Sequence, residues 1–371
     1  MNRSRTNRLL LSALLVLSIL TASELAARQG TSTDNKDAQR TVPVPKPAGG
    51  PAGAQEFSSY QEDFSVLPIS KNHLKLEIEV LGEKDDKPDL PFIRERWHLM
   101  WRPGDPIDLY VMKPRGVTRP PVVLYLYTFP QDTDRFKQDY WGGYTTGGGF
   151  AAVGFVSAVT GQRLEYRRAT DDFFNQMPEA LGASVHDVQM ILNYLQSRGD
   201  LDMTRVGMFG QGSGGAIAIL ASAVDPRIKA LDVLTPWGDW PTFLAKSTFI
   251  PAPERNDLNT PEFAAKVAGL DPLQWLPKIQ AQSLRIQNVR HDGHMPDNAQ
   301  MAMEAAAPQI AEIDQFGDGA AFVPAAMNGK IFDWMRAQLQ PDAHRGAPEK
   351  TRRVHYYPPQ MPANPLDMGQ H

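Results

Sequence analysis

The feature that most constrains the fold of this chain is a glycine-packed corner between an apolar strand and a helix. Residues 205–210 form a short apolar run, and residues 214–224 are rich in alanine, isoleucine and leucine. The connection contains glycines at positions 210, 212, 214 and 215. Glycine lets a backbone turn sharply and approach its neighbours closely. A buried strand that turns directly into a helix is typical of a mostly parallel sheet covered by helices.

The same alternation of strands and helices continues on both sides of this corner. Apolar runs predict strands at residues 122–128, 150–159, 230–235, 283–289 and 309–316. Earlier alternating runs, at 74–81, 92–101 and 107–112, predict an antiparallel entry to the sheet. Ser184 and Asp187 form a variant capping box that predicts a helix start at Ser184, and a closing helix is expected over 322–339. We therefore predict one α/β domain over residues 72–340, with helices on both faces of the sheet.

Residues 1–27 have the pattern of an export signal, because three arginines precede an apolar run that is followed by small residues. We expect cleavage after Ser23 or Ala27 and a secreted or periplasmic protein, with membrane contact only through an uncleaved signal anchor. Residues 28–71 are polar and proline-rich and are predicted to be a flexible linker. The proline-rich tail, residues 341–371, is predicted to be extended or disordered.

The composition argues against nucleic-acid binding, disulfide bonds and a lipid anchor. The 371 residues carry a net charge of −4 with a pI near 6.1, so the chain lacks the basic footprint that DNA or RNA binding requires. The absence of cysteine excludes disulfides and a lipoprotein anchor. An exported protein is separated from cytosolic nicotinamide pools, and we expect no cofactor. Arg163, Arg167 and Arg168 form a run that could bind an acidic ligand, although such runs are more often solvated.

A longer insert separates two of the predicted strands. It covers residues 238–276 and is bracketed by Trp237, Trp240 and Trp275. An insert at this point of the chain could form a small cap over the carboxyl edge of the sheet. Core packing explains the three tryptophans equally well.

These elements resemble the α/β-hydrolase superfamily, especially its branch of dienelactone hydrolases, acetyl xylan esterases and prolyl-oligopeptidase-like domains. The resemblance rests on the corner at 210–215, on the helix that precedes it, and on two later motifs. These motifs are Asp292-Gly-His-Met-Pro after the strand 283–289, and Gly-Asp-Gly-Ala320 after the strand 309–316. The family keeps its catalytic groups in the chain order nucleophile, acid, histidine.

The resemblance places the nucleophile position at Gly212, the acid position at Asp292 and the base position at Ala320. Ser213 falls one residue after the nucleophile position. A Ser-His-Asp site needs a hydroxyl to attack, an imidazole to take its proton, and a carboxylate to orient the imidazole. Glycine and alanine supply neither of the first two groups, so by this register two of the three catalytic side chains are missing.

The resemblance further implies an oxyanion hole made by the amide of Ser213 and an amide near Phe129, with Gln211 beside the turn. We therefore interpret the chain as an exported protein of α/β-hydrolase fold, with a mostly parallel central sheet and a small cap insertion. On this interpretation it has lost ester or peptide hydrolysis and retains a binding or scaffolding role. A small ester-like molecule is the expected ligand.

An alternative interpretation keeps Ser213 as the nucleophile of an active carboxylic-ester or peptide hydrolase, through a shift of the corner by one residue. Asp292 and His294 would then complete the site, with His291 and His344 as other candidates for the base. Neighbouring residues of an extended segment point to opposite faces, which argues against a pair between His291 and Asp292. A structural role for the Ser213 hydroxyl, satisfying amides at the start of the helix, competes with catalysis.

Two further patterns compete for the same residues. The corner satisfies Gly-x-Gly-x-x-Gly, the fingerprint of dinucleotide binding, with Asp232 at about the expected distance. A dinucleotide fold places this motif after its first strand, whereas several strands precede it here. His291, Asp292 and His294 could together bind a metal ion, but His-Asp-x-His is not a diagnostic zinc pattern, and we expect no metal.

Overall fold

The computed structural model describes residues 62–69, 83–102, 105–129, 135–159, 163, 173–327, 330–340 and 351–360. The chain divides into two units, Met1–Glu62 and Asp63–His371, and all the helices and strands described here belong to the second. The predicted export signal, most of the predicted linker, the predicted strand at 74–81 and His344 lie outside the described residues.

The second unit is built on one ten-stranded sheet with the order β1-β2-β3-β5-β4-β6-β7-β8-β9-β10. Strands β1 (Glu83–Asp85), β2 (Phe92–Leu99) and β3 (Ile107–Pro114) form the antiparallel entry. The parallel part comprises β4 (Pro121–Leu126), β5 (Ala151–Phe155), β6 (Asp202–Gln211), β7 (Ile228–Leu234), β8 (Ser283–Val289), β9 (Ala311–Phe316) and β10 (Arg353–Tyr357). Among the strands of the parallel part, β5 alone also has an antiparallel neighbour, β3, and the two parts meet there. The predicted antiparallel entry and parallel sheet are confirmed.

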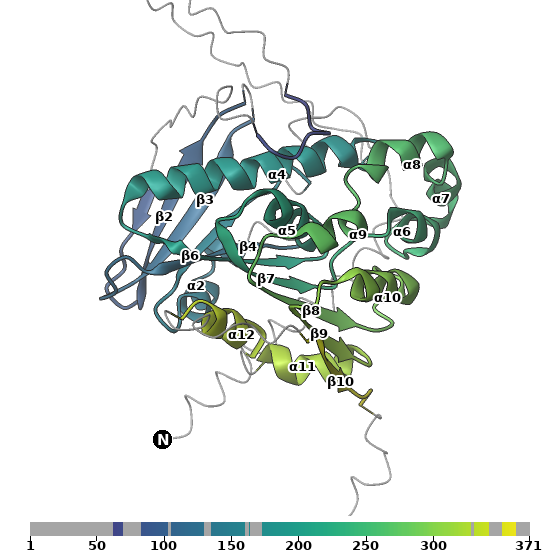
Figure 1. Ribbon diagram of the computed structural model, residues 1–371. Coiled ribbons are helices and arrows are strands. Elements are labelled where there is room, and N and C mark those ends of the chain that lie inside the picture. Colours follow the sequence, from purple (N-terminus) through teal and green to yellow (C-terminus); the bar gives the residue numbers. More distant parts are fainter. Residues whose placement is uncertain are drawn as a thin grey trace, which may run out of the picture. The chain divides into compact units, whose positions relative to one another are not determined.

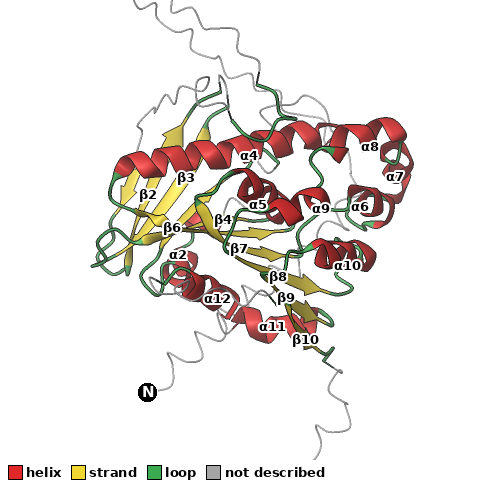
Figure 2. Ribbon diagram, viewed as in Figure 1, coloured by secondary structure: helices red, strands yellow, loops and turns green. Residues whose placement is uncertain are grey.

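Helices cover both faces of the sheet (Figure 1, Figure 2). One face carries α4 (Phe173–Arg198), α5 (Ser213–Val224), α9 (Pro272–Trp275) and α10 (Asp297–Ala306). The other carries α2 (Asp139–Thr145), α11 (Gly319–Met327) and α12 (Lys330–Gln338). Every residue of β4, β5 and β8 is buried, as a strand covered on both faces requires. No helix among the described residues has the length and apolarity that a bilayer span needs.

Two helix predictions were wrong in their bounds. Helix α4 begins at Phe173, not at Ser184, and continues through Pro178. The Ser184 hydroxyl donates to the carbonyl of Ala180 at 2.7 Å and accepts from the amide of Ala158 at 2.9 Å, so it does not cap a helix. The closing helix predicted at 322–339 is instead the two helices α11 and α12.

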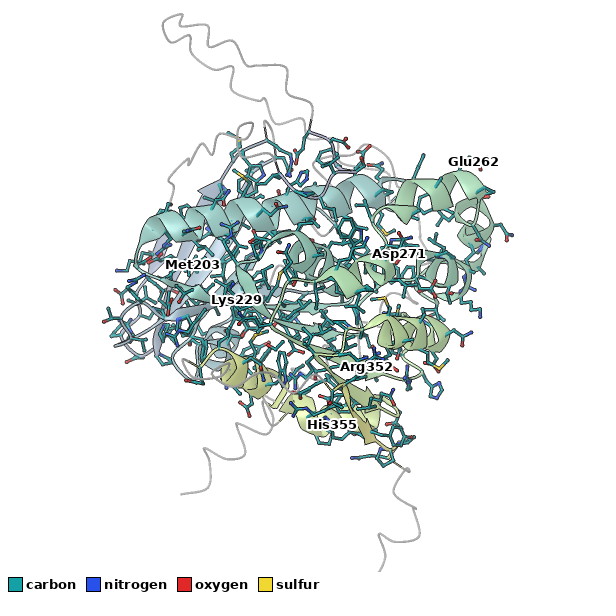
Figure 3. All side chains as sticks on the ribbon, in the orientation of Figure 1. Met203, Lys229, Glu262, Asp271, Arg352 and His355 are labelled. Carbon is teal, nitrogen blue, oxygen red and sulfur yellow. The ribbon has the colours of Figure 1, made fainter. Side chains whose placement is uncertain are left out.

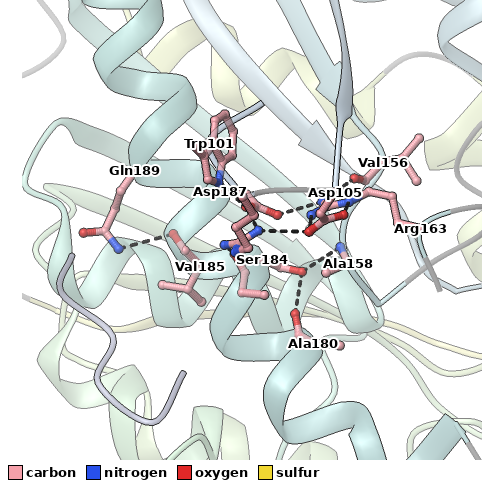
Figure 4. Close-up of polar contacts among 12 residues, drawn as sticks. Trp101, Asp105, Val156, Ala158, Arg163, Ala180, Ser184, Val185, Asp187 and Gln189 are labelled. Atoms are coloured by element: carbon pink, nitrogen blue, oxygen red, sulfur yellow. Dashed lines mark hydrogen bonds and ion pairs between the residues drawn. The ribbon is translucent and has the colours of Figure 1, made fainter. Parts of the chain in front are cut away.

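Asp187, the other member of the predicted capping box, belongs to a buried ion network (Figure 4). Its carboxylate accepts from Nε1 of Trp101 at 3.1 Å. It also accepts from Nη1 of Arg102 and from Nη1 of Arg163, both at 2.7 Å. Arg163 also pairs with Asp105, at 3.0 Å and 2.8 Å. Arg163 is buried, so the prediction of a solvated or ligand-binding side chain was wrong for this residue. Through Asp187, the network connects α4 to the segment before β3, which holds Arg102 and Asp105, and to Arg163 after β5.

The predicted linker ends earlier than residue 71, because its last part packs on α4. Leu67 is buried, and its carbonyl accepts from Nε2 of Gln189 at 2.8 Å. Oε1 of Gln189 accepts from the amide of Ile69 at 3.1 Å, and the carbonyl of Val66 lies 2.7 Å from Nε2 of His186. These contacts make residues 63–69 part of the folded unit.

Of the predicted tail, the structure describes residues 351–360, and five of these form a strand of the sheet. Strand β10 pairs in parallel with β9, from Arg353 beside Glu312 to Tyr357 beside Phe316. The sequence of β10, Arg-Val-His-Tyr-Tyr, is rich in residues that favour strands. The sheet therefore gains an edge strand from a segment that the sequence assigned to the tail.

Candidate functional site

The strand-to-helix corner turns at Gly212, between β6 and α5. Gly212 has φ 54° and ψ −117°, a conformation that only glycine adopts without strain. Its amide donates to the carbonyl of Leu234 at 3.0 Å, and its carbonyl accepts from the amides of Ala216 at 3.1 Å and Trp237 at 3.0 Å. The structure thus puts at the apex of the turn the residue to which the resemblance assigned the nucleophile position.

The space beside Gly212 is already occupied. A Cβ atom added there would lie 2.7 Å from Cβ of Thr128, closer still to its hydroxyl, and 3.3 Å from Nε1 of Trp237. Real Cβ atoms essentially never come within 3.0 Å of another heavy atom. Thr128 follows the carboxyl end of β4. A side chain at Gly212 would therefore require Thr128 to move.

The two backbone amides at the corner are engaged by hydroxyl groups of the chain itself. The amide of Ser213 donates to Oγ1 of Thr128 at 3.4 Å. The amide of Phe129 donates to Oγ of Ser213 at 2.9 Å. These are the two amides that the resemblance assigned to an oxyanion hole. Ser213 is completely buried, and its hydroxyl serves as an acceptor for a neighbouring loop rather than for its own helix.

Asp292 lies in the loop after β8 and is partly buried. One carboxylate oxygen accepts from the amide of Met295 at 3.0 Å, and the amide of His294 is a second donor to this side chain. Burial raises the pKa of Asp292 to about 7, although these two hydrogen bonds oppose the shift. Among the described residues, no imidazole is hydrogen-bonded to this carboxyl group.

The histidines of this loop do not form a catalytic pair with Asp292. Burial lowers the pKa of His294, so its ring is uncharged at neutral pH. That ring packs edge-on against Phe249, with centroids 5.7 Å apart, and no hydrogen bond from it to Ser213 or Asp292 exists in the described part of the chain. His291 is exposed and pairs with Asp297, at 2.8 Å from Nδ1 to Oδ2. Asp292 and His294 are therefore neighbours in the loop, but the imidazole ring is not hydrogen-bonded to the carboxylate in the described part of the chain.

Phe249, which the sequence analysis missed, lies at the centre of the candidate site. It comes from the insert between β7 and β8, which folds as α6 (Trp240–Lys246), α7 (Ala252–Leu258), α8 (Pro261–Ala268) and α9. Its ring contacts Phe129, Trp237 and His294, with centroids 5.7, 5.1 and 5.7 Å apart. These three residues follow the carboxyl ends of β4, β7 and β8, where Figure 1 shows the insert. The insert therefore reaches over the carboxyl edge, and an aromatic side chain fills the space beneath it.

The remaining predicted positions lie at the ends of β6 and β9. Gln211 is the last residue of β6 and is partly buried. Ala320 is exposed near the start of α11. The amide of Gly317, in the turn between β9 and Ala320, donates to the carbonyl of Tyr357 at 2.8 Å, so the tail packs on this turn.

The glycines of the corner serve close backbone packing. A Cβ at Gly210 would lie 2.5 Å from the carbonyl oxygen of Gly214, and one at Gly214 would lie 2.5 Å from that of Leu126. Asp232 is held by Arg285 through bonds of 3.0 Å and 2.7 Å. Asp232 is fully buried and paired with Arg285, so it is not available to a ribose hydroxyl as the dinucleotide fingerprint requires. Within the described ranges, no cluster of three or more metal-ligating side chains was found.

Comparisons with known proteins agree with this architecture. No family model matches the chain. An acetyl xylan esterase from Paenibacillus sp. R4 superimposes with a TM-score of 0.54 at 17% identity, over 69% of this chain and 89% of that one. A cold-adapted esterase from an Arctic intertidal metagenomic library gives 0.52 at 15% identity, over 71% and 100%. The chain has the α/β-hydrolase fold.

Peptidases share this fold as well. An acylaminoacyl peptidase from Pyrococcus horikoshii superimposes with a TM-score of 0.52 at 14% identity, over 68% of this chain and 42% of that one. Similarity at this level establishes the α/β-hydrolase fold and no particular activity. The chemistry has to be argued from the corner itself.

Proposed function

We propose that this α/β-hydrolase-fold protein does not hydrolyse esters or peptides at its strand-to-helix corner and acts instead by binding or scaffolding. One observation carries the proposal. Gly212 stands at the apex of the turn, and Thr128 fills the place that a nucleophilic side chain would need.

The chemistry of acyl transfer supports the same conclusion. The reaction requires an attacking hydroxyl, a base that removes its proton, and preorganised donors for the developing oxyanion. Gly212 and Ala320 carry no such groups. The amides of Ser213 and Phe129 are engaged with hydroxyls, and Phe249 lies between Phe129 and His294. A substrate carbonyl would have to displace all of these contacts.

Turnover of p-nitrophenyl acetate tests the proposal in the wild-type chain and in Ser213→Ala. The expected result is a rate that does not differ between the two proteins. Ser222→Ala is the matched control, because Ser222 is also a buried serine of α5. A rate that Ser213→Ala abolishes and Ser222→Ala leaves intact would overturn the proposal. It would favour the alternative site of Ser213, Asp292 and His294.

We also propose that the protein is exported, on the strength of residues 1–27 alone. The test is to express the full chain in a bacterial host and determine the amino terminus of the protein recovered outside the cytoplasm. An amino terminus after Ser23 or Ala27 is expected. Retention of the intact chain in the cytoplasm, with no difference from a chain lacking residues 1–27, would contradict export.

A further inference from the structure

A cavity lies on the face of the sheet that carries α11 and α12. Its volume is about 430 Å³, and it is lined by residues of β8, β9, both helices and the tail after β10. Cavities of roughly 300–1,000 Å³ accommodate small organic ligands. The cavity is separate from the Gly212 corner, none of whose residues line it.

Among the described residues of the lining, Arg285 carries the one positive charge, and this charge is neutralised within the protein. Arg285 binds both carboxylate oxygens of Asp232, at 3.0 Å and 2.7 Å, and donates to the carbonyl of Ile331 at 2.6 Å. Gln287 donates to the same Asp232 at 3.0 Å. Because the guanidinium is neutralised in this way, the cavity is poorly suited to a carboxylate or a phosphate.

Asp314 supplies an unused acceptor. Its Oδ1 pairs with Nδ1 of His355 at 2.9 Å, and Figure 3 labels His355 on β10. Its Oδ2 forms an ion pair with Nη1 of Arg285 at 3.6 Å, a distance longer than a hydrogen bond, and it accepts no hydrogen bond from the described residues. The side chain is only 9% exposed. Asp314 lines the cavity, so a ligand that enters the cavity can donate a charge-assisted hydrogen bond to this carboxylate oxygen.

The walls of the cavity are apolar and flat. Phe316 and Tyr357 stack with centroids 4.6 Å apart and an interplanar angle of 13°. Pro324 and Pro359 add further apolar surface. Such walls suit a planar hydrocarbon body attached to the group that reaches Asp314.

We propose that this cavity binds a small organic cation, a protonated amine on an aromatic or aliphatic body. The ammonium group donates to Oδ2 of Asp314, and the body packs against Tyr357 and the prolines. Asp232 and Asp314 face one guanidinium, and the imidazole of His355 pairs with Asp314. When this imidazole is neutral, the floor carries an excess negative charge, which favours a cation over an anion. The proposal does not depend on whether the Gly212 corner is catalytic.

Calorimetric titration of the full chain with phenethylamine and with 3-phenylpropionate tests the charge requirement. The two probes share a body and differ in the sign of their charge. We expect phenethylamine to bind at least about tenfold more tightly, and Asp314→Asn to remove about tenfold of that affinity. Asp333→Asn is the matched control, because Asp333 is an exposed carboxylate of α12 outside the cavity, and it should bind like the wild type. Equal affinity for the two probes, or an equal loss in both variants, would overturn the proposal.

A second variant tests the location without touching Asp314. Ala325 lines the cavity from α11, and Ala325→Trp should fill it and abolish phenethylamine binding while the circular dichroism spectrum is retained. A folded Ala325→Trp variant that binds phenethylamine like the wild type would contradict the proposed site. These binding measurements are independent of the hydrolysis assay, so the two proposals can fail separately.

Discussion

The Gly212 corner and the Asp314 cavity handle their polar groups in opposite ways. At the corner, the amides of Ser213 and Phe129 both find hydroxyl acceptors within the chain, and Thr128 fills the free space. In the cavity, a carboxylate oxygen of Asp314 has only a long ion pair with Arg285 and accepts no hydrogen bond from the described residues. The comparison teaches that the family position of a site and its capacity to bind can be separated.

The largest effect is expected at Asp187, a buried carboxylate whose hydrogen bonds are all made within the protein, in contrast to Asp314 in the cavity. Asp187→Asn should lower the free energy of unfolding by about 3–5 kcal/mol, because it leaves Arg102 and Arg163 buried with Asp105 as their shared carboxylate. Urea denaturation measures the loss, with the exposed Asp333→Asn as control. A loss no larger than that of the control would show that the network contributes nothing to stability.

Gly212→Ser tests whether the corner is as closed as the contacts indicate. The serine would have to keep the positive φ of Gly212, and its side chain would collide with Thr128. We therefore expect the free energy of unfolding to fall by about 3 kcal/mol. Adding Thr128→Gly should recover at least about 1 kcal/mol relative to the sum of the single variants. Additive single effects in this double-mutant cycle would contradict the claim that Thr128 occupies the nucleophile's place.

The raised pKa of Asp292 makes the free energy of unfolding of the chain depend on pH. Its pKa is about 7 in the folded chain and about 3.8 when exposed, so the folded state holds a proton that the unfolded state releases. Stability should therefore fall as pH rises between these two values. Asp292→Asn removes the titration, so the wild type should lose about 2–3 kcal/mol more than the variant between pH 5 and pH 8. Parallel pH profiles for the two proteins would show that Asp292 is not perturbed.

The smallest effect on stability is expected in the cavity. Asp314→Asn should change the free energy of unfolding by less than about 1 kcal/mol, because Arg285 keeps its bidentate partner Asp232 and an amide oxygen can still accept from His355. Urea denaturation beside Asp187→Asn provides the direct contrast. A loss as large as that of Asp187→Asn would mean that Asp314 is a structural charge rather than an unused acceptor.

Local sequence patterns predicted the elements whose burial is uniform. The strand at 283–289 has the predicted bounds, and the corner at Gly212 turns where its glycines indicated. The start of α4 was missed because the Ser184 hydroxyl bonds to Ala180 and Ala158, a choice that depends on the fold. Strand β10 was missed because a five-residue strand in a proline-rich tail has no periodicity that identifies its partner.

The candidate site was predictable only in part. The residues at the family positions, Gly212, Asp292 and Ala320, follow from motif spacing. The groups that fill the site, Thr128 and Phe249, come from other segments and carry no motif. Their proximity to the corner results from the packing of three loops, which spacing along one chain does not encode.

Intact-mass analysis of the wild-type chain after exposure to a fluorophosphonate probe tests the central claim most directly. The account predicts no stoichiometric adduct, because no hydroxyl at the corner is paired with a base among the described residues and Ser213 is buried. One adduct per chain, mapped to Ser213 or to Thr128, would contradict it.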